Sequence, residues 1–268
     1  MSRVIVVTSG KGGVGKTTTT ANLGMALAKR GHMVVVVDAD FGLRNLDLLL
    51  GLENRVVYTA LDALAGNCRL EQALVKDKRQ TKLALLPAAQ NRTKESITPQ
   101  QMKQLVKALS ARYQYILIDC PAGIEMGFRN AIAAATEAVI VTTPEIAAVR
   151  DADRVIGLLE AHGIKQIRLI VNRLRPAMVQ ANEMMSVADV QEILAVPLLG
   201  VVPDDEQVIV STNRGEPLVL QDSPSLAGQA LNNVARRLDG ETVEFLDLNH
   251  VNKGLLARLR EFLGDKWF

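Results

Sequence analysis

Aromatic residues are scarce in this sequence. Five Phe, three Tyr and one Trp account for 3% of its 268 residues. Proteins that bind single-stranded nucleic acid without sequence preference stack the bases on aromatic side chains, so this composition argues against such a platform. Cysteine is equally rare, because only Cys68 and Cys120 occur, far apart and at no metal-ligand spacing. The simplest interpretation is a reduced, cytosolic compartment.

Long apolar runs are missing as well. The longest, around residues 131–149, is interrupted by Glu137 and Pro144, so we predict no transmembrane helix. Met1 leads straight into an apolar segment, and we expect neither a leader nor a transit peptide. The three histidines are scattered along the chain, so no zinc site is predicted.

Most of the chain has no excess of charge. The sequence contains 31 Lys and Arg against 29 Asp and Glu, and residues 253–268 supply the whole difference with four basic and two acidic side chains. The other residues are therefore balanced at 27 of each sign. Residues 1–252 therefore carry no net charge, which argues against a general electrostatic attraction to DNA.

The most informative stretch is residues 10–17, GKGGVGKT, which fill every position of the phosphate-binding loop G-x-x-x-x-G-K-[ST]. An apolar run at residues 4–7 predicts a buried strand before it, and residues 18–30 predict a helix after it. The glycines let backbone N–H groups turn toward a polyphosphate, and the helix N-terminus adds its positive dipole end. We therefore predict nucleotide binding, with Lys16 reaching the β- and γ-phosphates and the Thr17 hydroxyl ligating Mg²⁺.

Lys11 is a second lysine inside this loop. Its side chain is free to point away from the phosphates of its own subunit. It could then reach a nucleotide held by a facing copy of the protein. The alternative is a solvated loop lysine without such a role.

Two further apolar runs end in carboxylates, as buried parallel strands do when they lead into a ligand site. Residues 33–37 precede Asp38 and Asp40, and one of these could steady the loop through Lys16 or orient an attacking water; the alternative is that both cap the next helix. Residues 115–119 end in Asp119, the pattern of a strand that holds Mg²⁺ directly or through water. In the segment that follows, the Gly123 backbone N–H can approach a γ-phosphate.

The rest of the pattern predicts one α/β domain of the P-loop NTPase type over residues 1–240. We expect a mostly parallel sheet covered by helices on both faces, because at least seven strands with continuous apolar character alternate with helices. The other expected strands are 83–86, 138–142, 167–171 and 198–202, and the other expected helices are 46–51, 57–64, 98–110, 146–162, 204–213 and 223–238. An amide such as Asn172, just after a strand, can pair with an adenine edge.

Residues 11–18, KGGVGKTT, resemble the deviant Walker A signature of the MinD/ParA ATPase family. The resemblance implies that Lys11 crosses the interface of a nucleotide-sandwich dimer. It also implies that the loop binds ATP through Lys11, Gly12, Gly13, Val14, Gly15, Lys16, Thr17 and Thr18.

Further motifs extend the resemblance over the full length, toward the Min-type members of the family. Residues 41–47 resemble switch I, which implies that Asn45 approaches the γ-phosphate and that Asp40 positions the water. Residues 119–125, DCPAGIE, are close to the switch II sequence D-x-P-A-G-I-E. The family places adenine contacts at Asn172 and in residues 203–205, here Pro203 and Asp205. Residues 149–154 resemble a surface that meets partner proteins; the alternative is a solvated helix face.

The C-terminal tail has an amphipathic pattern. Residues 241–252 predict a linker, and residues 253–268 predict a helix. Its apolar residues fall at helical spacing and include the only Trp of the chain: Leu255, Leu256, Leu259, Phe262, Leu263, Trp267 and Phe268. An apolar stripe with bulky aromatics and a cationic edge fits a helix lying in a membrane interface; the alternative is a terminal helix packed on its own domain. Residues 253–259 also resemble the family's membrane-targeting sequence.

Taken together, the resemblance implies an ATPase that uses ATP and Mg²⁺, forms an ATP-dependent homodimer and positions the division site of a cell or plastid as part of the Min system. A MinC-like inhibitor and a MinE-like activator are the implied partners. The implied location is cytoplasmic, peripheral on the cytoplasmic face of the inner membrane when ATP is bound. In this interpretation Lys11, Lys16 and Asp40 are the catalytic residues.

Other classes share parts of this pattern. A ParA-like DNA-segregation ATPase has the same core, but it should carry a basic DNA-facing surface and does not need this tail. A membrane scaffold that binds ATP and scarcely hydrolyses it would have an identical loop, so only turnover with and without lipid separates the two. An iron–sulfur electron donor would need a cysteine pair across the dimer, a pattern that Cys120 does not match.

Overall fold

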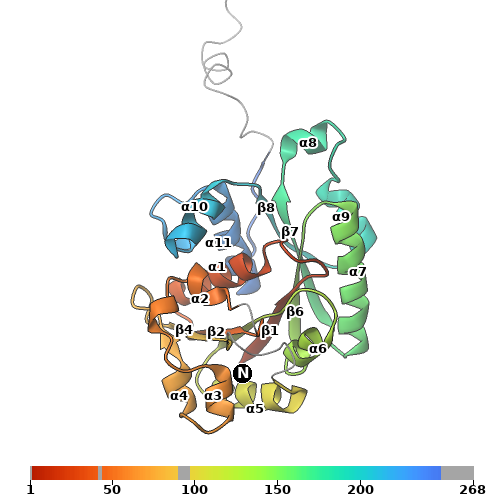
Figure 1. Cartoon of the computed structure of the whole chain (residues 1–268). Helices are drawn as coiled ribbons and strands as arrows, with labels where there is room; N and C mark the ends of the chain where they lie inside the picture. Colours follow the sequence, from red (N-terminus) through yellow and green to blue (C-terminus); the bar gives the residue numbers. More distant parts are fainter. Residues whose placement is uncertain (1, 42–43, 90–96, 249–268) are drawn as a thin grey trace, which may run out of the picture.

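An eight-stranded sheet runs through the described part of the chain, residues 2–41, 44–89 and 97–248 of a computed structural model (Figure 1). The strand order is β3-β4-β2-β5-β1-β6-β7-β8. The strands are β1 (Arg3–Thr8), β2 (Val34–Asp38), β3 (Val75–Lys76), β4 (Leu83–Leu86), β5 (Tyr115–Asp119), β6 (Glu137–Thr142), β7 (Gln166–Leu174) and β8 (Leu198–Pro203). Every neighbouring pair is parallel except β3 with β4. The predicted α/β class is confirmed.

Both faces of the sheet are buried, which explains why its strands are apolar at consecutive positions. Along β1, Ile5 and Val7 belong to one core cluster, while Val4 and Val6 belong to the other. Successive side chains of a strand point to opposite faces, so a strand covered on both sides must be apolar throughout.

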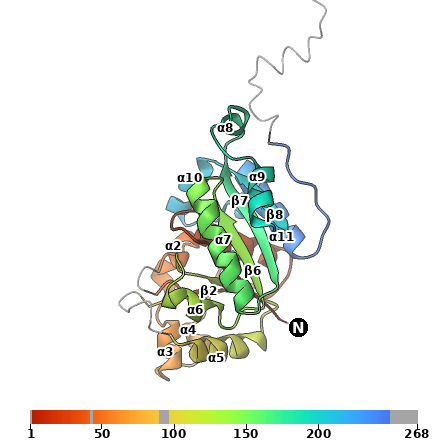
Figure 2. The same ribbon diagram turned by 90° about the vertical axis from the view of Figure 1, so that its right-hand side faces the viewer.

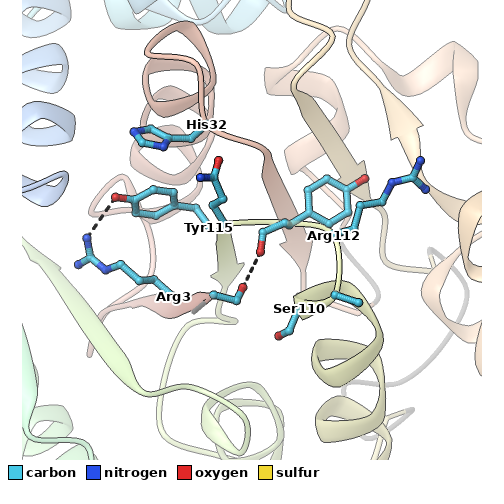
Figure 3. Close-up of a pocket in the computed structure, with 9 residues that line it drawn as sticks. Arg3, His32, Ser110, Arg112 and Tyr115 are labelled. Carbon is cyan, nitrogen blue, oxygen red and sulfur yellow. Dashed lines mark hydrogen bonds between the residues drawn. The ribbon is translucent and has the colours of Figure 1, made fainter.

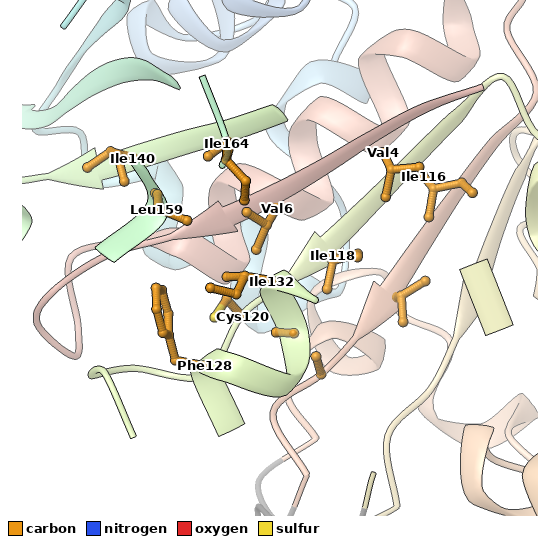
Figure 4. Close-up of a cluster of buried hydrophobic side chains, with 14 of the residues drawn as sticks. Val4, Val6, Ile116, Ile118, Cys120, Phe128, Ile132, Ile140, Leu159 and Ile164 are labelled. Atoms are coloured by element: carbon orange, nitrogen blue, oxygen red, sulfur yellow. The ribbon is translucent and has the colours of Figure 1, made fainter. Parts of the chain in front are cut away.

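Helices from different parts of the chain cover the two faces. The Ile5 face packs against α1 (Lys16–Lys29), α2 (Leu46–Leu49) and α11 (Leu226–Leu238). The opposite face packs against α5 (Pro99–Ser110), α6 (Met126–Ile132), α7 (Ile146–Ala161) and α9 (Val187–Leu194). Figure 4 shows part of this second cluster, with Phe128 and Ile132 of α6 beneath Val6 and Ile118 of the sheet.

The remaining helices are short: η1 (Glu53–Arg55), α3 (Ala60–Leu64), α4 (Leu70–Ala73), α8 (Pro176–Gln180), α10 (Gln207–Arg214) and η2 (Leu218–Leu220). Local capping shifts several helix starts from the predicted positions. The helix expected over residues 57–64 begins only at Ala60, because Thr59 and Asp62 form a capping box around its first turn. The pattern did not predict η1, α4, α6, α8, α9, η2 or the two-residue strand β3, all of which span eight residues or fewer and give little periodicity.

The chain after α11 lies against the domain. Arg237 Nε donates to the carbonyl of Val243 over 2.8 Å, and its guanidinium stacks 4.1 Å from the ring centre of Phe245. Leu248 is only 8% exposed. The linker over residues 241–252 stays a prediction, of which residues 241–248 are described; residues 249–252 and the predicted tail helix 253–268 lie outside the described residues. No helix within the described ranges is long and apolar enough to cross a membrane.

Candidate nucleotide-binding site

The loop from Ser9 to Gly15 joins β1 to α1 at the carboxyl edge of the sheet, and two of its glycines have backbone angles that other residues rarely adopt. The φ angle is 79° at Gly13 and 97° at Gly15. Gly15 precedes the first residue of α1, and its carbonyl accepts the Thr19 N–H over 2.9 Å. The loop thus turns sharply and leads directly into the N-terminus of a fourteen-residue helix. Backbone N–H groups in this arrangement bind phosphate.

Two distant elements hold this loop in place. A Cβ atom on Gly15 would lie 2.3 Å from the Asn172 amide nitrogen, and one on Gly10 would lie 2.3 Å from the backbone of Asp151 in α7. Asn172 Nδ2 also donates to the carbonyl of Val14 over 2.7 Å. The glycines are therefore needed for close packing as well as for the turn.

Lys16 and Asp119 lie at the buried floor of the loop. Lys16 is 7% exposed and Asp119 is 1% exposed. Burial raises the pKa of Asp119 to about 6, against the opposing effects of a hydrogen bond from the Thr17 hydroxyl and the charge of Lys16. The Thr20 hydroxyl lies 3.0 Å from Asp119 Oδ1.

This donor set fits Mg²⁺. The ion prefers oxygen ligands, and a buried carboxylate whose charge is incompletely compensated is stabilised by a nearby cation. Thr17 and Asp119, predicted from the sequence as ligands, are the residues that would hold it. Thr20 was not predicted; its only signal was a position one helical turn after Lys16, on the side of α1 that faces the sheet.

The two aspartates after β2 have different surroundings. Asp38 pairs in register with Asp119 and is 1% exposed. Its carboxylate accepts the backbone N–H of Asp40 at 2.9 Å and of Leu46, at the start of α2, at 3.3 Å. Burial, reinforced by the charge of Asp119, raises the pKa of Asp38 to about 8. Asp38 therefore secures the start of α2, whereas Asp40 lies partly exposed beyond the strand end.

The predicted switch segments lie at the same edge. Asn45 is exposed and immediately precedes α2; residues 42 and 43 of the predicted switch I lie outside the described residues. Gly123 follows β5 and has a φ angle of 88°. A Cβ atom on Gly12 would lie 3.7 Å from the Cβ of Ala122, so the loop after β5 approaches the phosphate-binding loop.

A cavity of about 590 Å³ adjoins the loop and gathers the residues predicted to contact adenine. Gly15, Thr18, Asn172, Pro203 and Asp205 line it. The bond from Asn172 to the loop leaves its amide oxygen free to accept from a base. Further lining residues, among them Arg173, Arg175, Val208 and Ile209, were not predicted, because nothing in the local sequence pattern links them to the loop.

Lys11 lies at the rim of the site and differs from Lys16 in exposure. Its side chain is 46% exposed, and its Nζ lies 3.3 Å from Glu145 Oε2, whose side chain is 56% exposed. The neighbouring residues Ile124 and Met126, after β5, and Ile146, at the start of α7, expose 43%, 54% and 76% of their surface. Charged and apolar side chains are therefore exposed at the edge of the sheet that carries the loop.

A second cavity, of about 420 Å³, lies at the opposite edge of the sheet, where β1 and β5 begin (Figure 3). Its polar groups serve the fold. Arg3 Nε donates to Glu137 over 2.7 Å, and the Tyr115 hydroxyl donates to Asp239 over 2.7 Å. His32 Nε2 lies 2.9 Å from the same carboxylate. These bonds tie the end of α11 to the sheet, and the cavity is far from the phosphate-binding loop.

The fold and the loop define a P-loop nucleotide-binding protein of the α/β class. A family model described as the CobQ/CobB/MinD/ParA nucleotide binding domain matches residues 5–218. The septum site-determining protein MinD of Synechocystis sp. is 64% identical over 263 residues, which cover 98% of this chain and 99% of that protein.

Solved structures agree. MinD in the MinC:MinD cell division protein complex of Aquifex aeolicus is 49% identical, with a TM-score of 0.86 over 92% of this chain and 99% of that one. MinD of Pyrococcus horikoshii, solved with Mg-ADP, is 35% identical, with a TM-score of 0.81 over 90% of this chain and 97% of that one. The chain belongs to the MinD/ParA family, and within it to the septum site-determining ATPases. It is an ATPase that uses ATP and Mg²⁺ in the selection of the division site.

Proposed function

We propose that the protein works as an ATP-gated dimer in which the two lysines of the loop act on different nucleotides. The observation that carries this proposal is their contrast in exposure: Lys16 is buried at 7%, whereas the side chain of Lys11 is 46% exposed at the rim. The ion pair of Lys11 with Glu145 is half exposed, and such pairs contribute at most about 1 kcal/mol. Lys11 can therefore exchange this partner for the phosphates of a facing copy at little cost.

The proposed reaction is in-line attack of water on the γ-phosphorus. Asp40, partly exposed beside the loop, orients the water. Lys16 from the same subunit and Lys11 from the facing subunit stabilise the negative charge that is shared among the phosphoryl oxygens in the transition state. Thr17 and Asp119 would hold Mg²⁺, which would supply further positive charge to the phosphates.

We infer that the remaining site residues bind the nucleotide. Asn45 and the Gly123 N–H approach the γ-phosphate from the two switch segments. Asn172, Pro203 and Asp205 contact the adenine in the cavity of about 590 Å³. The backbone of residues 12–18 holds the phosphates.

The ATP-bound dimer then settles on the membrane through its paired tails, residues 253–268, and hydrolysis releases it. Its proposed location is the cytoplasm and, with ATP, the cytoplasmic face of the inner membrane. The Aquifex aeolicus relative is in a complex with MinC, which supports a MinC-like inhibitor as a partner here. A MinE-like activator is the second proposed partner. Residues 149–154 of α7 are a candidate surface for both, because Arg150, Asp153 and Arg154 are exposed there.

Lys11→Ala should separate nucleotide binding from dimerisation. The variant should bind nucleotide as the wild type does, because Lys16 and the loop backbone remain. A charge buried at an interface contributes about 2–5 kcal/mol, so ATP-dependent dimerisation should weaken by at least about 30-fold. Size-exclusion chromatography with light scattering measures this, and Lys107→Ala, an exposed lysine of α5, is the control. A normal ATP-dependent dimer of Lys11→Ala would rule out its role across the interface.

Asp40→Ala should retain ATP binding and trap the dimer. The group that orients the water is lost, and proton-transfer groups of this kind contribute about 10²–10⁴-fold. Single-turnover hydrolysis should fall by that factor while light scattering still reports the dimer. Asp40→Asn, which keeps the shape of the side chain, should be equally slow. If Asp40→Ala hydrolyses ATP at the wild-type rate, another group positions the water.

A further inference from the structure

Two adjoining cavities flank the last described residues of the chain. The first, of about 410 Å³, is the apolar groove; Val179, Val187, Leu198, Val201, Phe245 and Leu246 line it. The second, of about 500 Å³, is the acidic pocket, which contains Asp204, Asp205 and Glu206. Leu174, Pro176 and Leu248 line both cavities. The two therefore form one depression between α8, the start of α9, β8 and the segment after α11.

The apolar groove presents its side chains to water. Phe245 is 48% exposed, and Val179, Val187, Leu198, Val201 and Leu246 are all partly exposed. Neighbouring apolar side chains that stay accessible in this way mark a surface that binds another apolar group.

The chain itself leads into this depression. Figure 2 shows the segment after α11 running along the domain toward α8. Its residues 245–248 form one wall of the apolar groove, and Leu248 is buried against the domain. Twenty residues follow, of which 253–268 carry the amphipathic pattern with Phe262 and Trp267.

The charges of the two parts are complementary. In the acidic pocket, Asp204 is paired with Arg175 at 2.6 Å, and Asp205 accepts the backbone N–H groups of Gln207 and Ala227, which leaves the exposed Glu206 as the carboxylate that can face the tail. The tail has four basic residues against two acidic ones. The apolar groove and the acidic pocket beside it therefore match the apolar stripe and the cationic edge of residues 253–268.

We propose that residues 253–268 dock into the apolar groove of their own chain when they are not in the membrane. A bulky side chain of the stripe, Phe262 or Trp267, fills the groove, and basic residues of the tail face the acidic pocket. This inference rests on the proposed function, in that the stripe sheltered by the groove is the one that enters the membrane. It goes beyond that function by giving the tail a second binding site within the protein.

Weak contacts are sufficient for this docking. Residues 249–252 connect the tail to the groove wall and span at most about 14 Å. A short connection of this kind holds a segment at an effective concentration in the millimolar range. Contacts that would bind a separate peptide only at millimolar concentration therefore keep a large share of the tails docked.

The docked tail competes with the membrane. The apparent affinity of the tail for lipid is its intrinsic affinity multiplied by the fraction of free tails, so docking of nine tails in ten lowers membrane binding about ten-fold. The groove thus suppresses membrane binding by the monomer. A dimer can still bind the membrane, because its two tails together raise the apparent affinity for lipid.

Trp267 is the only Trp of the chain, so its fluorescence reports on the tail in the unlabelled protein. The experiment measures acrylamide quenching of the full chain with Mg-ADP and no lipid, with the synthetic peptide 249–268 as the reference for a free tail. With nine tails in ten docked, the quenching constant of the wild type should be about ten-fold below that of the peptide.

Two variants of α9 provide a matched comparison. Val187→Glu places a carboxylate in the apolar groove, whereas Ile193→Glu makes the same change at a residue that is 52% exposed and lies outside the groove. Phe245→Ala tests the opposite wall. We expect Val187→Glu and Phe245→Ala to be quenched like the peptide and to bind mixed phosphatidylcholine and phosphatidylglycerol vesicles about ten-fold more tightly with ADP. Ile193→Glu should match the wild type, and nucleotide binding verifies that each variant is folded.

Several results would overturn the proposal: quenching of the wild type at the rate of the peptide, continued protection of Trp267 in Val187→Glu and Phe245→Ala, or exposure of Trp267 in Ile193→Glu. Protection that disappears on dilution would assign the groove to the tail of another copy and would overturn docking within one chain.

The membrane role is tested separately. Protection of Trp267 without any vesicle binding would leave docking intact and refute the membrane role, whereas ATP-gated vesicle binding with an exposed Trp267 would do the reverse.

Discussion

Lys16→Ala should lose at least about 10³-fold in ATP turnover, because it removes the cation that compensates charge on the transferring phosphoryl group. Lys16 is 7% exposed, and in such a water-poor site an electrostatic contact is stronger than it would be in solvent. The charge of Lys16 also opposes the burial that raises the pKa of Asp119 to about 6. Its loss therefore favours protonation of Asp119 and should weaken Mg²⁺ binding as well.

The measurement is steady-state ATPase activity with and without lipid. The same substitution at the other end of α1, Lys29→Ala, is the control; the Lys29 ammonium donates to the carbonyl of Val219 over 2.6 Å, and its loss should leave turnover unchanged. Lys16→Arg should be inactive too, because a planar guanidinium does not replace a compact ammonium in a tight loop. Activity of Lys16→Ala near that of the wild type would remove Lys16 from the catalytic machinery.

Membrane binding should be gated by the number of tails in each particle. A single sixteen-residue amphipathic helix binds lipid only marginally, much as one short acyl chain does. Linking two tails in a dimer makes the second insertion effectively intramolecular, which raises the apparent affinity by roughly 10²–10⁴ without a new contact. ATP would then control residence on the membrane by assembling the dimer. Docking of the tail in the groove would lower the binding of the ADP form further.

Vesicle sedimentation of the wild type and of Phe262→Asp, each with ATP and with ADP, tests this gate. Phe262 and Trp267 are aromatic residues that would bury a large apolar area in lipid, so Phe262→Asp should abolish binding in both nucleotides, whereas Phe262→Leu should retain most of it. Equal binding of the wild type with ATP and ADP would contradict the gate. Undiminished binding of Phe262→Asp would show that the tail is not the anchor.

The sequence by itself determined the features that depend on neighbouring residues. The phosphate-binding loop is one contiguous strand–turn–helix unit, and its glycines at positions 13 and 15 have the positive φ angles that the motif requires. The continuous apolar runs identified seven of the eight strands in the described residues, because both faces of each of these strands are covered. The motifs after β2 and β5 could also be placed at one edge of the sheet, because the carboxyl ends of parallel strands lie together.

Only the tertiary structure decided which distant groups meet at that edge. Thr20 reaches Asp119 across 99 residues of sequence, Lys11 reaches Glu145 across 134, and Asn172 reaches the loop carbonyl of Val14 across 158. The difference between Asp38 and Asp40 arose in the same way, because β5 inserts between β2 and β1 and brings Asp119 beside Asp38. Strand order and helix packing set these contacts. They depend on the free energy of the whole core and leave no periodic trace in the sequence around any one of the residues.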